Sequence, residues 1–93
     1  MLLSKGDGMY KNRGKNGRNN VSGVNIRKIR EEMGEQAGEP TSQRALAEML
    51  QREGLDVDKN VIQRIESGER FVTDIELQVI AKVLKVKIDR LMK

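Results

Sequence analysis

Residues 41 to 70 contain two short helical patterns separated by a turn, and this stretch restricts the possible folds more than any other part of the chain. The first pattern has apolar side chains at helical spacing: Leu46, Met49 and Leu50. The second, at roughly 100° per residue, has its apolar side chains on one side of a helical wheel: Val61, Ile62 and Ile65. The stretch therefore predicts two amphipathic helices that pack through one face each.

The opposite side of the second helix carries polar and cationic side chains: Lys59, Asn60, Gln63 and Arg64. Lys or Arg can donate to O6 and N7 of guanine, and the amide of Asn or Gln pairs with adenine through a donor and an acceptor. A solvated helix face carries the same residue types without binding anything, so the face alone leaves both interpretations open. Its place on the second of two helices joined by a turn favours a reader of the DNA major groove.

The length of 93 residues gives room for one small domain and not for two. With one Phe, one Tyr and no Trp, the core must come from Leu, Ile, Val, Met and Ala, a set that favours helices. We therefore expect an all-α fold.

The chain contains no Cys and no His, which removes disulfides, thiolate and imidazole chemistry and the commonest zinc ligands. We expect no enzyme, no cofactor and no metal, and we interpret Glu31, Glu32 and Glu35 as solvated charge rather than as a carboxylate site. No stretch approaches the ~20 apolar residues of a membrane span, and the first residues lack the apolar block of a signal peptide. These features predict a cytoplasmic protein with no membrane association.

The formal net charge of +4 comes entirely from residues 1–24, which hold five cations against Asp7 alone. Residues 25–93 hold 13 basic and 13 acidic groups. Because residues 1–24 are rich in Gly and Asn and have no apolar period, they predict a flexible, disordered basic arm. The arm could add phosphate or minor-groove contacts, or it could be a leader without a role.

Helix start and stop signals predict five helices between residues 25 and 92. The first covers residues 25–33 and ends at Gly34, and a loop over residues 35–40 leads to a second helix over 43–52. The remaining signals are capping residues and glycines: Ser42, Gly54, Asp58, Gly68 and the Thr73–Glu76 capping box of the fourth helix. A short fifth helix over 88–92 is expected to turn three apolar side chains inward: Val86, Ile88 and Leu91.

An ordered set of motifs resembles the Cro and phage-repressor type (XRE-like) of helix-turn-helix domain over residues 25–93. The matching positions are Arg30 with Gly34, Ser42-Gln43 with Leu46-Ala47 and Leu50, Val57-Asp58 with Ile62, Ile65-Glu66 and Gly68, and Ile80-Ala81 with Leu84, Val86 and Leu91. The resemblance implies a compact five-helix bundle of the lambda-repressor-like type, with the helix-turn-helix motif at about residues 42–66.

The resemblance also implies roles for particular residues. Ser42 and Gln43 would hold the DNA backbone, and the four polar residues of the third helix would face the bases. Arg30 and Glu66 would form a partly buried scaffold bridge. Gly68 and Arg70 would lie where a loop approaches a phosphate through backbone amides and a basic side chain, although an ordinary glycine-bearing turn with a solvated Arg has the same residues.

Two departures from the family pattern concern chain length. The stretch from Gly34 to Ser42 is longer than usual, and extra residues between Leu50 and Ile62 must lengthen the second helix or its turn. Asp58 also stands where the family often has Ser, and its carboxylate would repel a phosphate unless it is occupied by capping amides.

These features favour a sequence-specific double-stranded DNA-binding transcriptional regulator. The expected mode is a repressor that binds an operator as a homodimer, with half-sites roughly 34 Å apart. The alternative is an antitoxin-like or antagonist module whose third helix meets a protein partner such as a toxin. The expected dimer surface lies on the fourth and fifth helices, at Val83, Ile88 and Met92, although the same residues could complete a monomeric core.

Overall fold

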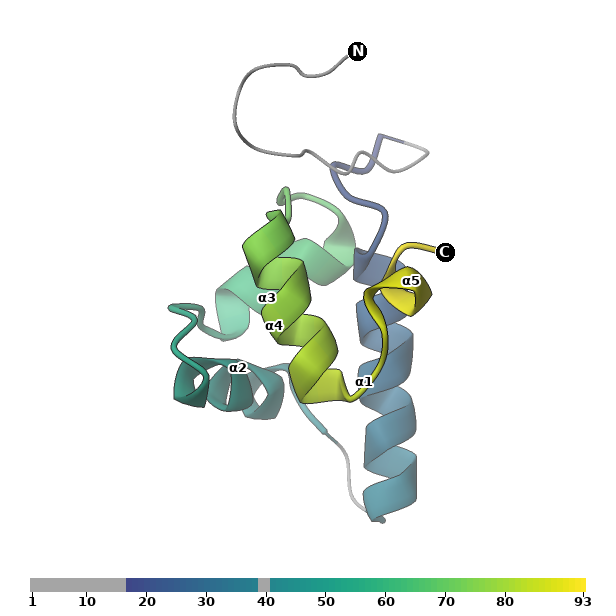
Figure 1. Ribbon diagram of the computed structural model, residues 1–93, viewed down its shortest axis with the longest axis vertical. Helices are drawn as coiled ribbons and strands as arrows, with labels where there is room; N and C mark the ends of the chain where they lie inside the picture. The colour runs from purple at the N-terminus through teal and green to yellow at the C-terminus, as the bar shows by residue number, and fades with distance from the viewer. Residues whose placement is uncertain (1–16, 39–40) are drawn as a thin grey trace.

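The computed structural model describes residues 17–38 and 41–93, which form five helices and, within these ranges, no strand. The helices are α1 (Gly23–Ala37), α2 (Gln43–Arg52), α3 (Lys59–Ser67), α4 (Asp74–Leu84) and α5 (Ile88–Leu91). In Figure 1, α1 runs along one side of the bundle, α4 crosses in front of α3, and α5 lies beside the start of α1. The predicted all-α, five-helix fold is confirmed.

One aliphatic core joins all five helices. Its members are buried apolar side chains: Ile26, Ile29, Leu46, Ala47, Leu50, Val57, Ile62, Ile65, Val72, Leu77, Ile80, Ala81, Leu84 and Leu91. The core is built from the aliphatic residue types that the composition leaves available, and each amphipathic helix contributes its predicted apolar face.

The predicted caps fix where three helices begin. Ser42 Oγ accepts a hydrogen bond from the Ala45 amide at 3.0 Å, and Asp58 Oδ1 accepts one from the Val61 amide at 2.9 Å. Thr73 and Glu76 form the complete capping box of α4. Because α2 ends at Arg52 as expected, the extra residues before α3 lie in the turn and do not lengthen α2.

The first helix is longer than predicted at both ends. It begins at Gly23 rather than residue 25, and it continues through the buried Gly34 to Ala37, where Gly38 ends it with a φ of 79°. One internal glycine costs only about 1 kcal/mol, and Glu35, Gln36 and Ala37 are good helix formers, so the helix continues. This extension takes up much of the long stretch that precedes Ser42.

The boundary of the predicted arm also differs. Residues 18–20 bond the backbone at the end of α3, and Asn20 and Ser22 are completely buried. The expectation of disorder is therefore wrong for these residues, because the side chains of residues 18–20 bond backbone groups that the local sequence does not reveal. Residues 1–16 lie outside the described ranges, and the prediction of a disordered arm there stays a prediction.

The inward orientation predicted for Ile88 is wrong. Ile88 is 38% exposed, whereas Leu91 is fully buried. Because α5 has only four residues, it has a single core-facing position, and its first residue lies at the edge of the bundle.

Candidate nucleic-acid interface

The outer face of α3 consists of Lys59, Asn60, Gln63 and Arg64, and all four side chains are exposed. The inner face buries Ile62 and Ile65 at 1% exposure each, with Val61 half-buried beside them. The helical wheel thus assigned the two faces correctly, and packing against the core fixes which side chains of α3 point outward.

The four side chains of the outer face make no hydrogen bond within the described part of the chain, and neither Lys59 nor Arg64 has a carboxylate at ion-pair distance there. Asn60 and Gln63 each retain both amide donors and the carbonyl acceptor. The face therefore offers the donor and acceptor groups needed to contact base edges without first breaking internal contacts.

Glu66 joins three helices at the back of this face. It accepts from Arg30 Nε at 2.8 Å and Arg30 Nη2 at 2.9 Å, and from Gln43 Nε2 at 3.0 Å. Arg30 also donates through Nη1 to the Thr41 carbonyl. The hydrogen bonds that Arg30 donates to Glu66 outweigh burial and raise the pKa of Arg30. The predicted bridge between the two side chains is therefore present.

Ser42 and Gln43 lie at the amino end of α2, as the resemblance implies. Ser42 is exposed, and its oxygen accepts from the Ala45 amide, which leaves the hydroxyl hydrogen able to donate to a phosphate. Gln43 is half-buried and uses one amide hydrogen on Glu66, which leaves one hydrogen for another acceptor.

Arg70 and the loop before it are committed to internal contacts. The Arg70 guanidinium donates to both carboxylate oxygens of Glu76, at 3.0 and 2.9 Å, and to the Phe71 carbonyl. The backbone amides of residues 68, 69 and 70 donate to the carbonyls of Arg64 and Ile65. The charge of Arg70 is therefore balanced, and these loop amides already have acceptors.

Sequence reasoning missed the segment Arg18–Asn20, which lies against the carboxyl end of α3. Asn20 Nδ2 donates to the carbonyls of Ile65 at 2.9 Å and Arg70 at 2.8 Å, and Asn20 Oδ1 accepts from the Gly23 amide. The bond between the Gly23 amide and Asn20 Oδ1 spans three positions, which is the spacing of a helix cap. An Asn three positions before Gly23 was therefore a local indication that this segment is ordered.

The comparisons with known proteins agree with this geometry. A family model described as Helix-turn-helix matches residues 41–91, which is more than half of the chain. The chain belongs to the XRE-type helix-turn-helix family. No curated protein and no solved structure matches it.

The helix-turn-helix domain is that of a DNA-binding transcription regulator of the XRE type, and such domains are not typically enzymatic. Within the described ranges, no group of His, Cys, Asp or Glu is placed to hold a metal ion, and no helix is long and apolar enough to cross a membrane.

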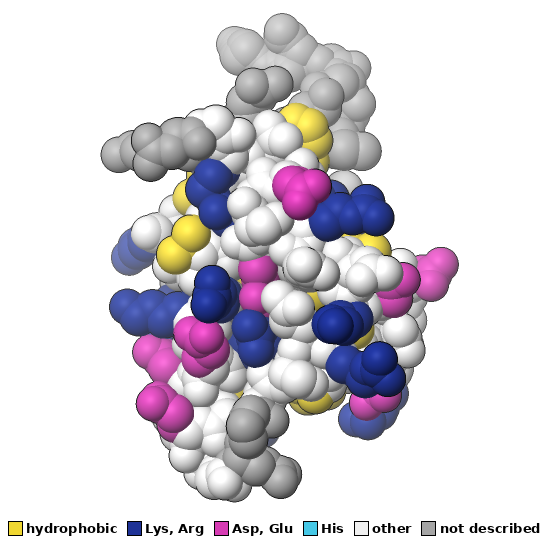
Figure 2. Space-filling model, turned by 180° about the vertical axis from the view of Figure 1, so that it is seen from behind, with side chains coloured by type: hydrophobic (Ala, Val, Ile, Leu, Met, Phe, Trp, Pro, Cys, Tyr) yellow, Lys and Arg dark blue, Asp and Glu magenta, His cyan; other side chains and the backbone are white. Residues whose placement is uncertain are grey.

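Charge is mixed on the α3 side of the helix-turn-helix domain. Figure 2 views the molecule from behind and shows Lys and Arg side chains spread over this face, with Asp and Glu side chains among them. DNA binding by this face would therefore rely on a few well-placed cations and not on a broad basic surface.

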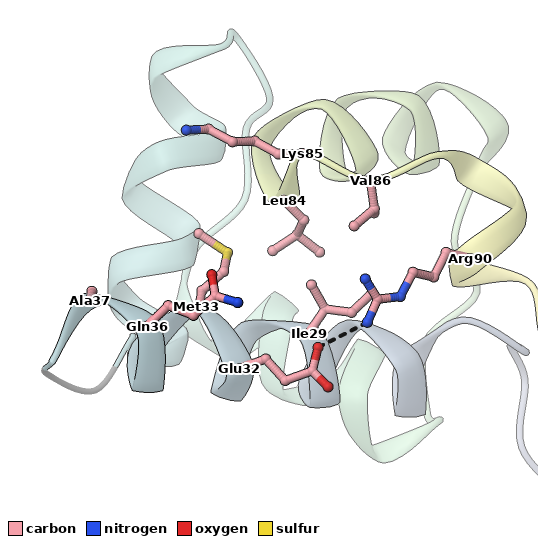
Figure 3. A pocket seen from close by; sticks show the side chains of 9 residues that line it. All are labelled: Ile29, Glu32, Met33, Gln36, Ala37, Leu84, Lys85, Val86 and Arg90. Atoms are coloured by element: carbon pink, nitrogen blue, oxygen red, sulfur yellow. Dashed lines mark hydrogen bonds and ion pairs between the residues drawn. The ribbon is translucent and has the colours of Figure 1, made fainter.

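A separate groove of about 500 Å³ lies between α1 and the α4–α5 connection (Figure 3). Five apolar side chains line it together with polar ones: Ile29, Met33, Ala37, Leu84 and Val86. At its edge, Arg90 forms an ion pair of 2.9 Å with Glu32. The groove is at the carboxyl end of α4, away from the α3–α4 connection, so it is distinct from the outer face of α3.

Proposed function

We propose that this protein is a sequence-specific repressor that inserts α3 into the major groove of an operator. The observation that carries the proposal is the outer face of α3, whose four polar side chains are exposed and lack partners within the described residues. A rigid helix with free donors and acceptors is suited to direct readout of bases. As a regulator that acts on the genome, it would work in the cytoplasm.

The proposed contacts divide into two classes. Lys59, Asn60, Gln63 and Arg64 would read base edges, while the Ser42 hydroxyl and the remaining amide hydrogen of Gln43 would donate to backbone phosphates. The link from Gln43 through Glu66 to Arg30 supports this division, because it fixes the start of α2 relative to α3. Occupation of the operator would repress by excluding polymerase.

We propose a homodimer formed through α4 and α5. Ile88 is exposed, and Val83 and Met92 are half-buried at the edge of the core, so apolar surface remains there for a second copy. Sedimentation velocity across a concentration series tests this point, and a monomer at all concentrations, with and without DNA, would rule it out.

The alternative is a protein-binding module in which α3 meets a toxin or another regulator. The equal numbers of acidic and basic groups in residues 25–93 and the mixed charge in Figure 2 support it. A mainly apolar protein interface would not show the steep salt dependence of phosphate binding.

Selection of preferred sites from a random duplex-DNA pool tests the proposed function. Enrichment of a pseudo-palindrome with half-sites one helical turn apart would support a dimeric operator binder. Absence of enrichment, with weak binding that vanishes in moderate salt, would favour the protein-binding alternative.

A further inference from the structure

We infer that Arg18 contacts a DNA phosphate at the carboxyl end of α3, in the role that the family resemblance implies for Arg70. The inference rests on the proposed function and extends it to a residue outside the matched family segment. Three observations support it: the position of the Arg18 side chain, the charges around that side chain, and the ion pair of Arg70 with Glu76.

The Arg18 side chain lies across the turn that ends α3. Nη2 donates to the Glu66 carbonyl at 2.7 Å, and Nη1 donates to the Ser67 carbonyl at 3.1 Å in an exposed contact. Gly68 lies directly beneath, since a Cβ atom there would fall 2.8 Å from Cζ of Arg18. The Asn19 amide donates to the Gly68 carbonyl at 2.8 Å and holds the segment in place.

The segment 18–20 covers the negative end of α3. Each backbone carbonyl from residue 65 to residue 70 accepts a hydrogen bond from Arg18, Asn19 or Asn20. Uncovered carbonyls at a helix carboxyl end would repel a phosphate, whereas a cation there is favourable. Arg18 therefore places a cation at the carboxyl end of α3.

Arg18 and Arg70 differ in their partners. Within the described ranges, Arg18 donates only to carbonyls and has no carboxylate at ion-pair distance. Arg70 forms a 2.9 Å ion pair with Glu76. Because Nη1 of Arg18 carries two hydrogens and donates one to Ser67, the other can donate to a phosphate oxygen.

The position agrees with docking of α3. Ser67 is exposed and follows Gln63 and Arg64 by four and three positions, so it continues the outer face by one turn. The amino-terminal residues of a recognition helix contact the bases, so its carboxyl end lies nearer the backbone. The Arg18 guanidinium, bound to the Ser67 carbonyl, is at that end.

The salt dependence of binding tests the inference. A duplex carrying the selected site is titrated at several salt concentrations with the full chain and with Arg18→Gln, Arg18→Lys, Arg70→Gln and Arg27→Gln. Loss of one phosphate contact makes the negative slope of log K against log salt shallower by about 0.9. We expect this loss for Arg18→Gln, while Arg18→Lys and the other two variants keep the slope of the parent.

Thermal unfolding of each variant separates a contact from a structural effect. A parental slope in Arg18→Gln, with only a lower Tm, would show that the segment is purely structural and would overturn the inference. The inference is also overturned if the salt dependence becomes shallower in Arg70→Gln and not in Arg18→Gln. If Arg18→Gln does not fold, Arg18→Met is measured in its place. Met keeps an unbranched aliphatic side chain over Gly68 and removes the charge.

The parent is measured first, so two failures are distinguishable. If the parent shows no salt-dependent binding to duplex DNA, both the proposed function and the inference are refuted. A parent that binds, with an Arg18→Gln variant of equal slope, refutes the role of Arg18 alone.

Discussion

Arg30 of α1 and Glu66 of α3 form a two-point pair, with Nε to Oε2 at 2.8 Å and Nη2 to Oε1 at 2.9 Å. Their side chains are 11% and 3% exposed. Gln43 adds a third helix to the pair through its bond to Glu66. Because this contact restrains rotation of α3 about its own axis, it helps to fix which side chains of α3 point outward.

Replacement of Glu66 by Ala should lower the free energy of unfolding by about 3 to 5 kcal/mol, since it leaves the Arg30 charge buried and unpaired. Urea denaturation measures the change. Glu31→Ala is the control, because it removes an exposed pair with Arg27 and should change stability by less than about 1 kcal/mol. Equal stability of the two variants would contradict a structural role for the Arg30–Glu66 pair.

Asn20→Ala should destabilise the domain by at least about 2 kcal/mol. It removes a fully buried side chain that serves the Ile65 and Arg70 carbonyls and the Gly23 amide, and each unpaired buried group costs about 1 to 3 kcal/mol. Asn60→Ala, on the exposed face of α3, should stay within about 0.5 kcal/mol of the parent. A thermal melt of Asn20→Ala that overlays the parent would show that the segment 18–20 does not stabilise the fold.

Gln63→Ala and Arg64→Ala should each reduce discrimination at particular base pairs by about 1 to 3 kcal/mol and leave the melting temperature unchanged. Competition binding with single-base variants of the selected site measures this change. Gln78→Ala, on the exposed side of α4, is a matched control that should keep the parental preference. A uniform loss on every sequence would argue against base reading.

Asp58→Asn should tighten DNA binding, because it removes a negative charge from the amino end of α3 while Asn remains a good cap for the Val61 amide. Stability should fall by no more than about 1 kcal/mol, the usual dipole contribution of such a charge. Asp58→Ala also removes the charge but loses the cap, at a cost of about 0.5 to 2 kcal/mol. Unchanged affinity in the Asn variant would show that this carboxylate lies far from phosphate.

Stability should depend on pH through Glu76. Burial acts to raise the pKa of Glu76, but the hydrogen bonds from Arg70 and from Thr73 outweigh it, so the pKa lies below its ordinary value. A carboxylate whose pKa is lowered by folding contributes its full stability above the pKa of the unfolded chain. That contribution is lost as the pH falls through the lower folded value.

The measurement for Glu76 is the urea midpoint from about pH 6 down to about pH 3, where carboxylates titrate. The parent should lose more stability over this range than Glu76→Gln, which has no titrating group at this position. Glu48→Gln, on the exposed side of α2, should follow the parent. If the urea midpoints of the parent and Glu76→Gln change in parallel with pH, Glu76 does not contribute to the acid sensitivity of the fold.

Features of the fold that depend on near neighbours were predictable. Ser42, Asp58 and Thr73 each bond an amide three positions away, so their caps could be recognised from the residue types alone. The spacing of apolar residues likewise assigned the two faces of α3. The Arg30–Glu66 bridge required the family resemblance, because nothing local to either residue indicates its partner.

The sequence by itself determined the helical class, the number of helices and the outer face of α3, because local periodicity and capping act within one or two turns. Tertiary structure decided which polar groups remain free. Asn20 bonds the Arg70 carbonyl across 50 positions, and Arg18 bonds the Ser67 carbonyl across 49. Such contacts depend on how α1 and α3 pack and not on local propensity, which is why a segment that resembles a disordered arm is ordered against the end of α3.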